Sequence, residues 1–336
     1  MAEQFLHLGN QERKEILETL ASQLGRNAKV LEKDVWVCWV LSVLFSMPGA
    51  YRMAFKGGTS LSKIYATINR FSEDIDVTVD YQELAKAMND DFDPFADGQS
   101  RNQIRKFSER LREAVKAYAL TQIVPHIRAE LNKFPNASEH RLVVSDDGQD
   151  IYVYYPSEIA GDDYMLDNVK IELGGRNVIN PNETHRVTAD LSEHIKTLEF
   201  PSCDEVVALS AERTFWEKVT LVHALCSRGE FKETPDRLSR HWYDLHVLLQ
   251  TSIAQNAIED EELLRNVIAV KKCFFHTDHA NYDACLNKAF TLTPTAEMAS
   301  ALKVDYAKMR IMIYDESPSF DTIIQALSTL ESQLNS

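Results

Sequence analysis

One stretch constrains the fold more than any other: "FKGGTSLSKIYATINRFSEDIDVTVD", residues 55–80. It opens on two glycines, after which apolar residues recur at the three- and four-residue spacing typical of a helix. This helical stripe consists of Leu61, Ile64, Tyr65 and Ile68. Ile75, Val77 and Val79 then alternate with polar residues, which is the period of a strand. The stretch, with "YRMAFK" before it, therefore predicts a strand, a turn, a helix and a second strand.

Composition limits the class of protein. The chain has 336 residues, of which 44% are hydrophobic and 26% are charged, so it can bury a sizeable core and is long enough for about two domains. Its net charge of −15 argues against non-specific coating of nucleic acid. That charge still leaves room for a local basic cleft or for a basic protein partner.

Two further features bear on location. No apolar run reaches the roughly 18 residues that a membrane span needs, and the first residues do not resemble a secretory signal, so we expect no membrane association. The five cysteines are scattered and form no CxxC motif. We therefore expect a reduced, cytoplasmic protein.

The order of patterns along the chain predicts an α+β fold. Residues 10–48 have helical patterns, with Asn10 as an N-cap and Gly25 as a stop, and residues 102–133 form a long amphipathic pattern. Short β-type runs fill residues 141–200, and from Asp204 the pattern is helical to the end. We predict N-terminal helices over residues 1–50, a core with a small mixed sheet over 51–200, and a helical C-terminal domain over 201–336.

Asp74 and Asp76 indicate a metal site. Alternate residues of a strand project from one face, so these two carboxylates would lie a few ångströms apart and repel each other. A divalent cation between them removes that repulsion, and Mg²⁺ favours such oxygen ligands together with substrate phosphates. Two such ions can hold the attacking and leaving oxygens of a phosphoryl transfer.

The double glycine supplies a candidate phosphate site. Gly57 and Gly58 have no Cβ, so backbone N–H groups can approach a triphosphate closely. The helix that we expect to start at Thr59 adds its dipole, and Thr59 and Ser60 add hydroxyls. Alone, a Gly-Gly pair is often only a turn, and an exposed strand face often carries aspartates. Joined in this order, the two features favour nucleotidyl transfer.

These motif residues resemble those of a known family. "GGTSLSK" followed by "RFSEDIDV" is similar to the AbiEii/AbiGii nucleotidyltransferase toxins, a branch of the DNA polymerase β-like superfamily. The gap between Gly58 and Asp74 is longer than in many members of that superfamily, but it resembles the gap of this branch. The upstream segment "EKDVWVCWVLSVLF" is also similar, and the resemblance covers about residues 30–250. It implies the polymerase β-like nucleotidyltransferase core.

The resemblance implies a third acid on a neighbouring strand, close to the attacking hydroxyl. In "NVKIELGGR", Glu172 shares a face with Lys170 on a short strand that ends in two glycines. Glu172 would then join Asp74 and Asp76 as a metal ligand and would act as general base. The alternative is a surface Lys–Glu pair, which contributes little to stability.

Two helical motifs of the C-terminal half also match the family. Its members carry a lysine in an "ER…EK" helix and an aspartate in an "R…YDL" helix, and Lys218 and Asp244 occupy these positions. The resemblance implies that Lys218 contacts the nucleotide and that Asp244 is a supporting acid. From the residues alone, Lys218 could instead extend from an apolar helix to solvent, and Asp244 could pair with Arg240. Glu212, Arg213 and Arg240 are secondary candidates for phosphate contact or support.

Taken together, the resemblance implies a nucleotidyltransferase that depends on Mg²⁺ or Mn²⁺ and is the toxin of a toxin–antitoxin or phage-defence system. Its helical C-terminal domain would complete the active-site cleft. The substrates would be an NTP and an acceptor hydroxyl, most simply the 3′ end of tRNA, and a cognate antitoxin would be the partner. Two alternatives stay open on the same fold: a protein-modifying or kinase-like transferase, and a non-catalytic nucleotide-binding module.

Overall fold

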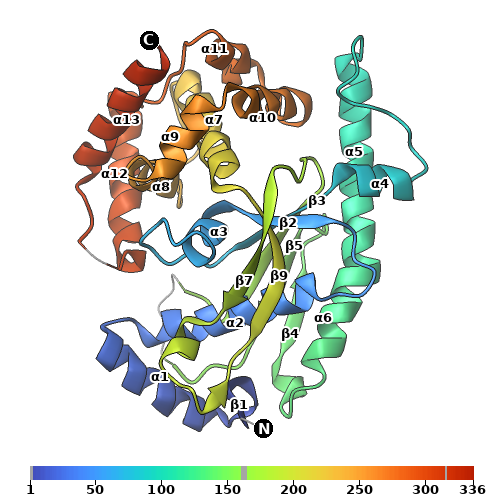
Figure 1. The fold of residues 1–336 in the computed structure, drawn as a ribbon, viewed down its shortest axis with the longest axis vertical. Helices are drawn as coiled ribbons and strands as arrows, with labels where there is room; N and C mark the ends of the chain where they lie inside the picture. The colour runs from blue at the N-terminus through green and yellow to red at the C-terminus, as the bar shows by residue number, and fades with distance from the viewer. Residues whose placement is uncertain (1–2, 160–164, 315) are drawn as a thin grey trace. The chain divides into compact units, whose positions relative to one another are not determined.

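The computed structural model describes residues 3–159, 165–314 and 316–336, and the chain divides into two units (Figure 1). Unit 1 comprises Met1–Ile64, Glu73–Phe92 and Lys106–Ala208. Unit 2 comprises Tyr65–Ser72, Asp93–Arg105 and Leu209–Ser336. Residues 65–72, which connect the glycine motif to the aspartate strand, therefore belong to unit 2. The coarser division at residues 50 and 200 stays a prediction.

Unit 1 is built on a mixed sheet that has seven strands within the described residues, in the order β4–β5–β6–β3–β2–β9–β7. The strands are β2 (Met53–Lys56), β3 (Ile75–Val79), β4 (Arg141–Val144), β5 (Asp150–Tyr154), β6 (Asn168–Gly174), β7 (Asn182–Thr188) and β9 (Ser202–Leu209). β3 is antiparallel to β2 and parallel to β6, so strands distant in sequence meet at the centre. A separate ladder joins β1 (Glu3–Gln4) to β8 (Leu198–Glu199).

One face of this sheet is buried because apolar residues alternate along its strands. Ile75, Val77, Ile151, Val153 and Ile171 are all fully buried there. The helices of unit 1 are α1 (Asn10–Leu24), α2 (Ala28–Phe45), α3 (Gly57–Lys63), α4 (Tyr81–Ala87), α6 (Val124–Leu131) and, from Lys106 onward, α5 (Arg101–Tyr118). α2 packs against β6 and β7, and α5 continues through a π-helical turn into α6, forming the green rod beside the sheet in Figure 1.

Unit 2 is helical. Its helices are α7 (Ala211–Arg228), α8 (Arg240–Leu248), α9 (Ser252–Glu259), α10 (Glu261–Phe274), α11 (Tyr282–Leu286), α12 (Ala296–Met309) and α13 (Phe320–Leu334). Several begin at a side chain that accepts a hydrogen bond from a backbone N–H of the first turn, as Ser210 does for α7 and Asp260 for α10. Across the described part of the chain, no helix combines the length and the apolar character that crossing a membrane requires.

The α+β class with a small mixed sheet is confirmed, whereas three predicted details are wrong. The helix after the glycines begins at Gly57 rather than Thr59 and ends at Lys63, and the chain turns away at Ala66, whose φ is +49°. Residues 202–209 form β9 rather than part of a helical region, because Val206 and Ala208 are fully buried at alternate positions and Ala208 pairs with β2. The N-cap of α1 is Gly9 rather than Asn10.

Candidate active site

The double glycine lies directly against the second aspartate of the motif. Gly57 has a φ of +81°, and a Cβ placed on it would come within 2.2 Å of Asp76 Oδ2. Both the backbone conformation and the close approach therefore require glycine at this position. The motif joins a backbone turn and a carboxylate in unit 1, as a phosphate site beside a metal site would need.

The two hydroxyls that follow the glycines stabilise this turn. Thr59 Oγ1 donates a hydrogen bond to the carbonyl oxygen of Asp74 at 2.6 Å, and Ser60 Oγ donates one to the carbonyl oxygen of Gly57 at 3.0 Å. Both side chains are buried. Asp74 itself lies one residue before β3 and is fixed beside α3 by the bond from Thr59. The phosphate-binding role of Thr59 and Ser60 stays a prediction.

A row of four charged residues crosses the sheet at the level of Asp76. The register pairs Asp76 with Lys56 of β2 on one side and with Glu172 of β6 on the other, and it pairs Glu172 with Asp150 of β5. We call these four residues the acid row, after its three carboxylates. Paired residues project from the same face of a sheet, so the acid row lies on the face opposite the buried isoleucines. The structure thus places Glu172 on the strand beside Asp76.

Lys170 partly neutralises the acid row. Its Nζ lies 2.5 Å from Glu172 Oε1 and 3.2 Å from Asp150 Oδ2. Burial alone would lower the pKa of Lys170, but the hydrogen bonds and charges of Glu172 and Asp150 raise that pKa above its ordinary value. Lys170 therefore remains a cation at neutral pH and holds the side chain of Glu172.

The donor set fits a divalent cation in its chemistry. Asp74 and Asp76 offer carboxylate oxygens, which Mg²⁺ prefers, and the backbone of the glycine turn lies directly beside Asp76. Among the residues that the structure describes, however, no three His, Cys, Asp or Glu side chains are grouped so that they could hold a metal ion. Glu172 hydrogen-bonds with Lys170 instead. Metal binding by all three acids therefore stays a prediction.

Buried ion pairs hold the segments on either side of the motif. Lys33 of α2 pairs with Glu73, the residue before Asp74, and both side chains are buried. Lys63, at the end of α3, lies 2.5 Å from Asp34 and 2.6 Å from Asp190. Burial opposes the charge of Lys63, but these two carboxylates raise its pKa above the ordinary value. From the sequence, Lys63 could have steered nucleotide or belonged to a solvated face, and no role was assigned to its partners or to Lys33, although "EKD" in an otherwise apolar helix was the available signal.

The predicted residues of the helical half form a sealed cluster in unit 2. Asp244 is fully buried and accepts hydrogen bonds from Arg70 Nε at 2.7 Å and Nη2 at 2.8 Å, while its Oδ2 lies 2.9 Å from Lys218 Nζ. Burial alone would raise the pKa of Asp244, but the two cations hold it well below its ordinary value. The pKa of Lys218 is lowered, because burial outweighs the attraction of Asp244.

The segment that carries Arg70 is anchored at several points in unit 2. Tyr65 Oη donates to the carbonyl oxygen of Leu209 at 2.9 Å, and the backbone N–H of Phe71 donates to the carbonyl oxygen of Met312 at 2.7 Å. This anchoring accounts for the long gap between Gly58 and Asp74, since the connection contributes its own contacts to the helical unit. Sequence analysis missed the link because Arg70 and Asp244 are 174 residues apart.

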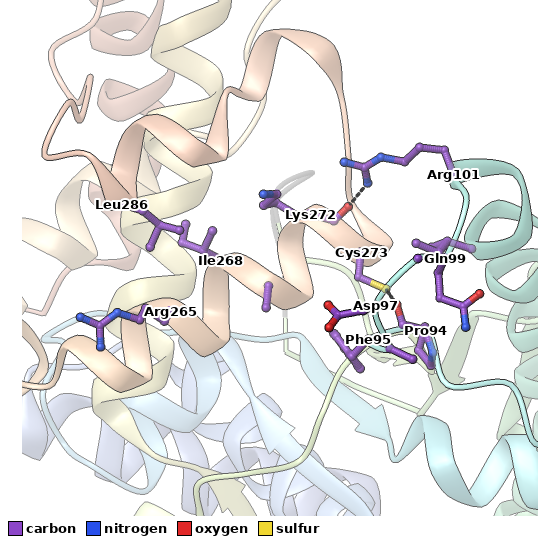
Figure 2. A pocket seen from close by; sticks show the side chains of 14 residues that line it. Pro94, Phe95, Asp97, Gln99, Arg101, Arg265, Ile268, Lys272, Cys273 and Leu286 are labelled. Atoms are coloured by element: carbon purple, nitrogen blue, oxygen red, sulfur yellow. Dashed lines mark hydrogen bonds between the residues drawn. The ribbon is translucent and has the colours of Figure 1, made fainter.

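Three cavities among the described residues lie away from this site. One in unit 2, of about 520 Å³, is an open hollow between His246 and α13. Figure 2 shows another in unit 2, of about 460 Å³, between the 94–101 loop and α10; there Arg265 pairs with Glu261 and Lys272 with Asp283. The third, of about 260 Å³, belongs to unit 1 and has aromatic side chains in its wall. None of the three is lined by a residue that the sequence analysis placed in the site.

A family model described as "Nucleotidyl transferase AbiEii toxin, Type IV TA system" matches residues 40–326. The chain belongs to this family. This AbiEii protein is therefore a nucleotidyltransferase toxin, and the family implies an NTP substrate and an antitoxin partner. Among solved structures, the nucleotidyltransferase toxin MenT4 of Mycobacterium tuberculosis H37Rv matches with 15% identity and a TM-score of 0.43, over 95% of this chain and 99% of that chain. No curated protein matches the sequence.

Proposed function

We propose that this AbiEii nucleotidyltransferase binds an NTP at the glycine turn of unit 1 and transfers its NMP to the 3′ hydroxyl of tRNA, with Mg²⁺ or Mn²⁺ as cofactor. One observation carries the proposal. Gly57 packs on Asp76, and Asp76 stands in register with Glu172 on the next strand. A glycine turn and two neighbouring, half-exposed acids are thus combined in unit 1.

The proposed reaction is a displacement at the α-phosphorus of the NTP. The acceptor oxygen forms a new bond to this phosphorus, the bond from the phosphorus to the pyrophosphate oxygen breaks, and pyrophosphate leaves. Glu172 takes the proton of the acceptor hydroxyl, for which it must exchange its contact with Lys170.

The other residues bind and orient. The backbone N–H groups of Gly57 and Gly58 would hold phosphate oxygens, and Asp74 and Asp76 would hold the metal, with Glu172 as a third ligand. A bound divalent cation supplies neutralisation of the charge that develops on the phosphate oxygens.

Lys218 and Asp244 are proposed to act as a pair. Lys218 would contact the nucleotide phosphates, as the family implies. Asp244 supports it, because its carboxylate fixes the ammonium of Lys218 and the guanidinium of Arg70 at once. In this arrangement Asp244 is a positioning residue.

The test is transfer of label from each of four α-labelled NTPs, with Mg²⁺, to total tRNA and to cell extract. We expect label in RNA from one NTP with the wild-type protein and none with Asp76→Ala. Asp146→Ala is the matched control, because Asp146 is exposed on the turn between β4 and β5 of the same unit.

The remaining outcomes discriminate between alternatives. Label that enters protein instead of RNA would replace the proposal with a protein-modifying transferase. Nucleotide binding without any labelled product would favour a non-catalytic nucleotide-binding module. Undiminished transfer by Asp76→Ala would overturn the assignment of the site.

A further inference from the structure

We propose that β4 and β5 form a platform on which the single-stranded 3′ end of the RNA acceptor stacks, with Tyr152 and Tyr154 as the stacking residues. We call this surface, made of Tyr152, Tyr154 and Arg141, the tyrosine platform. The inference rests on the proposed function, since it names the surface that holds the acceptor of that same reaction.

The tyrosine platform shares a face of the sheet with the acid row. Along β5, Asp150, Tyr152 and Tyr154 are half-exposed, whereas the intervening Ile151 and Val153 are fully buried. Asp150 is paired with Glu172, so the two tyrosines continue from the acid row along the same strand. Their Cα atoms are two residues apart, which is about 6.8 Å in an antiparallel strand.

The platform reaches the border of the sheet. β4 is the terminal strand of the strand order, and its Val143 and Arg141 pair with Tyr152 and Tyr154. A chain that enters over β4 would therefore meet the acid of β5 first, then the acid of β6 and then that of β3.

A local cation gives the platform the charge that a phosphate chain needs. Arg141 is exposed, and its guanidinium carbon lies 4.1 Å from the centroid of the Tyr154 ring. Within the described residues it forms no ion pair, in contrast to Lys170, which Glu172 and Asp150 neutralise. In a chain of net charge −15, an exposed arginine without a carboxylate partner is a specific feature beside the site.

This combination favours single-stranded RNA over other ligands. Aromatic rings on a sheet face stack on unpaired bases of any sequence, and a stacked arginine contributes cation–π and phosphate contacts. The bases of a duplex are already stacked on each other and cannot reach such rings. A 3′ end lying across the platform would present its last hydroxyl towards the acid row.

Binding can be measured without catalysis. The probe is a 5′-fluorescent single-stranded RNA 12-mer with an unmodified 3′ hydroxyl, titrated with the full chain in the absence of NTP. We expect Kd to rise about 10-fold in Tyr152→Ala and in Tyr154→Ala, as loss of one base–aromatic stack predicts. Tyr152→Phe should bind like the wild type, because it keeps the ring.

Two controls make the result specific. Phe275→Ala removes an exposed ring of similar size from unit 2, where Phe275 is 39% exposed, and should leave Kd unchanged. Arg141→Gln should make the salt dependence of binding shallower by about one ion. Thermal midpoints of all variants confirm folding. Equal Kd for both alanine variants and the wild type would overturn the platform.

Kinetics separate this inference from the proposed function. With labelled NTP, the alanine variants should raise KM for RNA about 10-fold at nearly unchanged kcat. If the wild type transfers label and both variants have its KM for RNA, the platform is overturned while the proposed function stands. If RNA binding needs both tyrosines but the wild type transfers no label, the platform stands while the proposed function is overturned. If the alanine variants bound RNA as tightly as the wild type but no longer captured a co-expressed antitoxin, the surface would bind a protein and the RNA assignment would be overturned.

Discussion

The acids of unit 1 and the acid of unit 2 stand in opposite environments. In the acid row, the Glu172 side chain is 39% exposed and pairs with Lys170, which is itself accessible to solvent. In unit 2, Asp244 is fully buried and holds both Arg70 and Lys218. A carboxylate that water reaches can exchange its partner for a ligand, whereas a sealed one cannot do so without leaving buried charges unpaired.

This difference in exposure predicts different roles for acidic residues that a motif search treats alike. In the proposed function, the acid row holds the metal and accepts the proton of the acceptor hydroxyl. In the cluster of Asp244, Arg70 and Lys218, the buried carboxylate holds the two cations in place. Replacing an acid by its amide should therefore damage chemistry in one region and stability in the other.

The largest expected effect is on chemistry. Asp76→Asn should lower the rate of nucleotidyl transfer by about 1,000-fold or more, because a charge that stabilises phosphoryl transfer is lost. The free energy of unfolding should change by less than about 1 kcal/mol, since Asp76 is half-exposed. Transfer assays and urea denaturation on the same preparations measure both quantities. If Asp76→Asn lost much stability but little transfer activity, Asp76 would have a structural role rather than a chemical one.

The second largest expected effect is on the stability of unit 2. Asp244→Asn should lower the free energy of unfolding by about 3–5 kcal/mol, because Arg70 and Lys218 would be left as uncompensated buried charges. The matched variant, Glu172→Gln in unit 1, should lower it by less than about 1 kcal/mol, because an exposed ion pair contributes little. Urea denaturation measures both. Equal losses in the two variants would abolish the distinction between the regions.

Glycine substitutions sharpen the account of the turn. Gly57→Ala and Gly98→Ala both force alanine into a left-handed conformation, at φ values of +81° and +82°, and each should lower stability by about 1–2 kcal/mol. Only Gly57 is packed on Asp76, whereas nothing lies within 4 Å of the Cβ position of Gly98.

Gly57→Ala should therefore also lower transfer by at least about 10-fold, because displacement of the reacting groups is costly. Gly98→Ala should retain full transfer. Full activity in both variants would show that the contact between Gly57 and Asp76 is not needed for the reaction.

The smallest effect is a pH dependence. The pKa of Asp244 is depressed in the folded protein, so its contribution to stability is fully present above the unfolded value of about 3.9 and is lost as pH falls towards the folded value. Between pH 6 and pH 3, the wild type should lose about 1 kcal/mol more than Asp244→Asn. Denaturation curves at both pH values measure this difference. An identical pH dependence of the two proteins would contradict the depressed pKa.

The sequence predicted local features better than distant ones. The period of two in "DIDVTV" and the presence of a helix at the double glycine could be recognised because each depends on neighbouring residues, although the first residue of that helix was placed two positions too late. Glu172 could be recognised as a strand residue, but its pairing with Asp76 depends on a register that local pattern does not contain. β9 was missed because the first half of "SCDEVVAL" is mostly polar, and its short apolar end lies next to the helix α7, from which it is separated by Ser210 alone.

Long-range ion pairs were the main omission. Lys33 and Glu73 are 40 residues apart, and Arg70 and Asp244 are 174 residues apart. In each case a charged residue in an apolar setting was visible, but charge alone does not identify its partner. The exposure of the acid row and the sealing of Asp244 likewise emerge only when the whole fold is present.

The anchoring of residues 65–72 also has a consequence for how the toxin is made. When the ribosome has synthesised the chain as far as Ala208, nearly all of the sheet exists, but the anchors of this segment have not yet been translated. Asp244, the partner of Arg70, and Met312, which holds Phe71, are both translated after this sheet. In a chain released early, residues 65–72 therefore lack these anchors, and contacts within unit 1, such as that of Thr59 with Asp74, hold the glycine turn beside the aspartates. The connecting segment can reach its anchored position only after unit 2 has been translated.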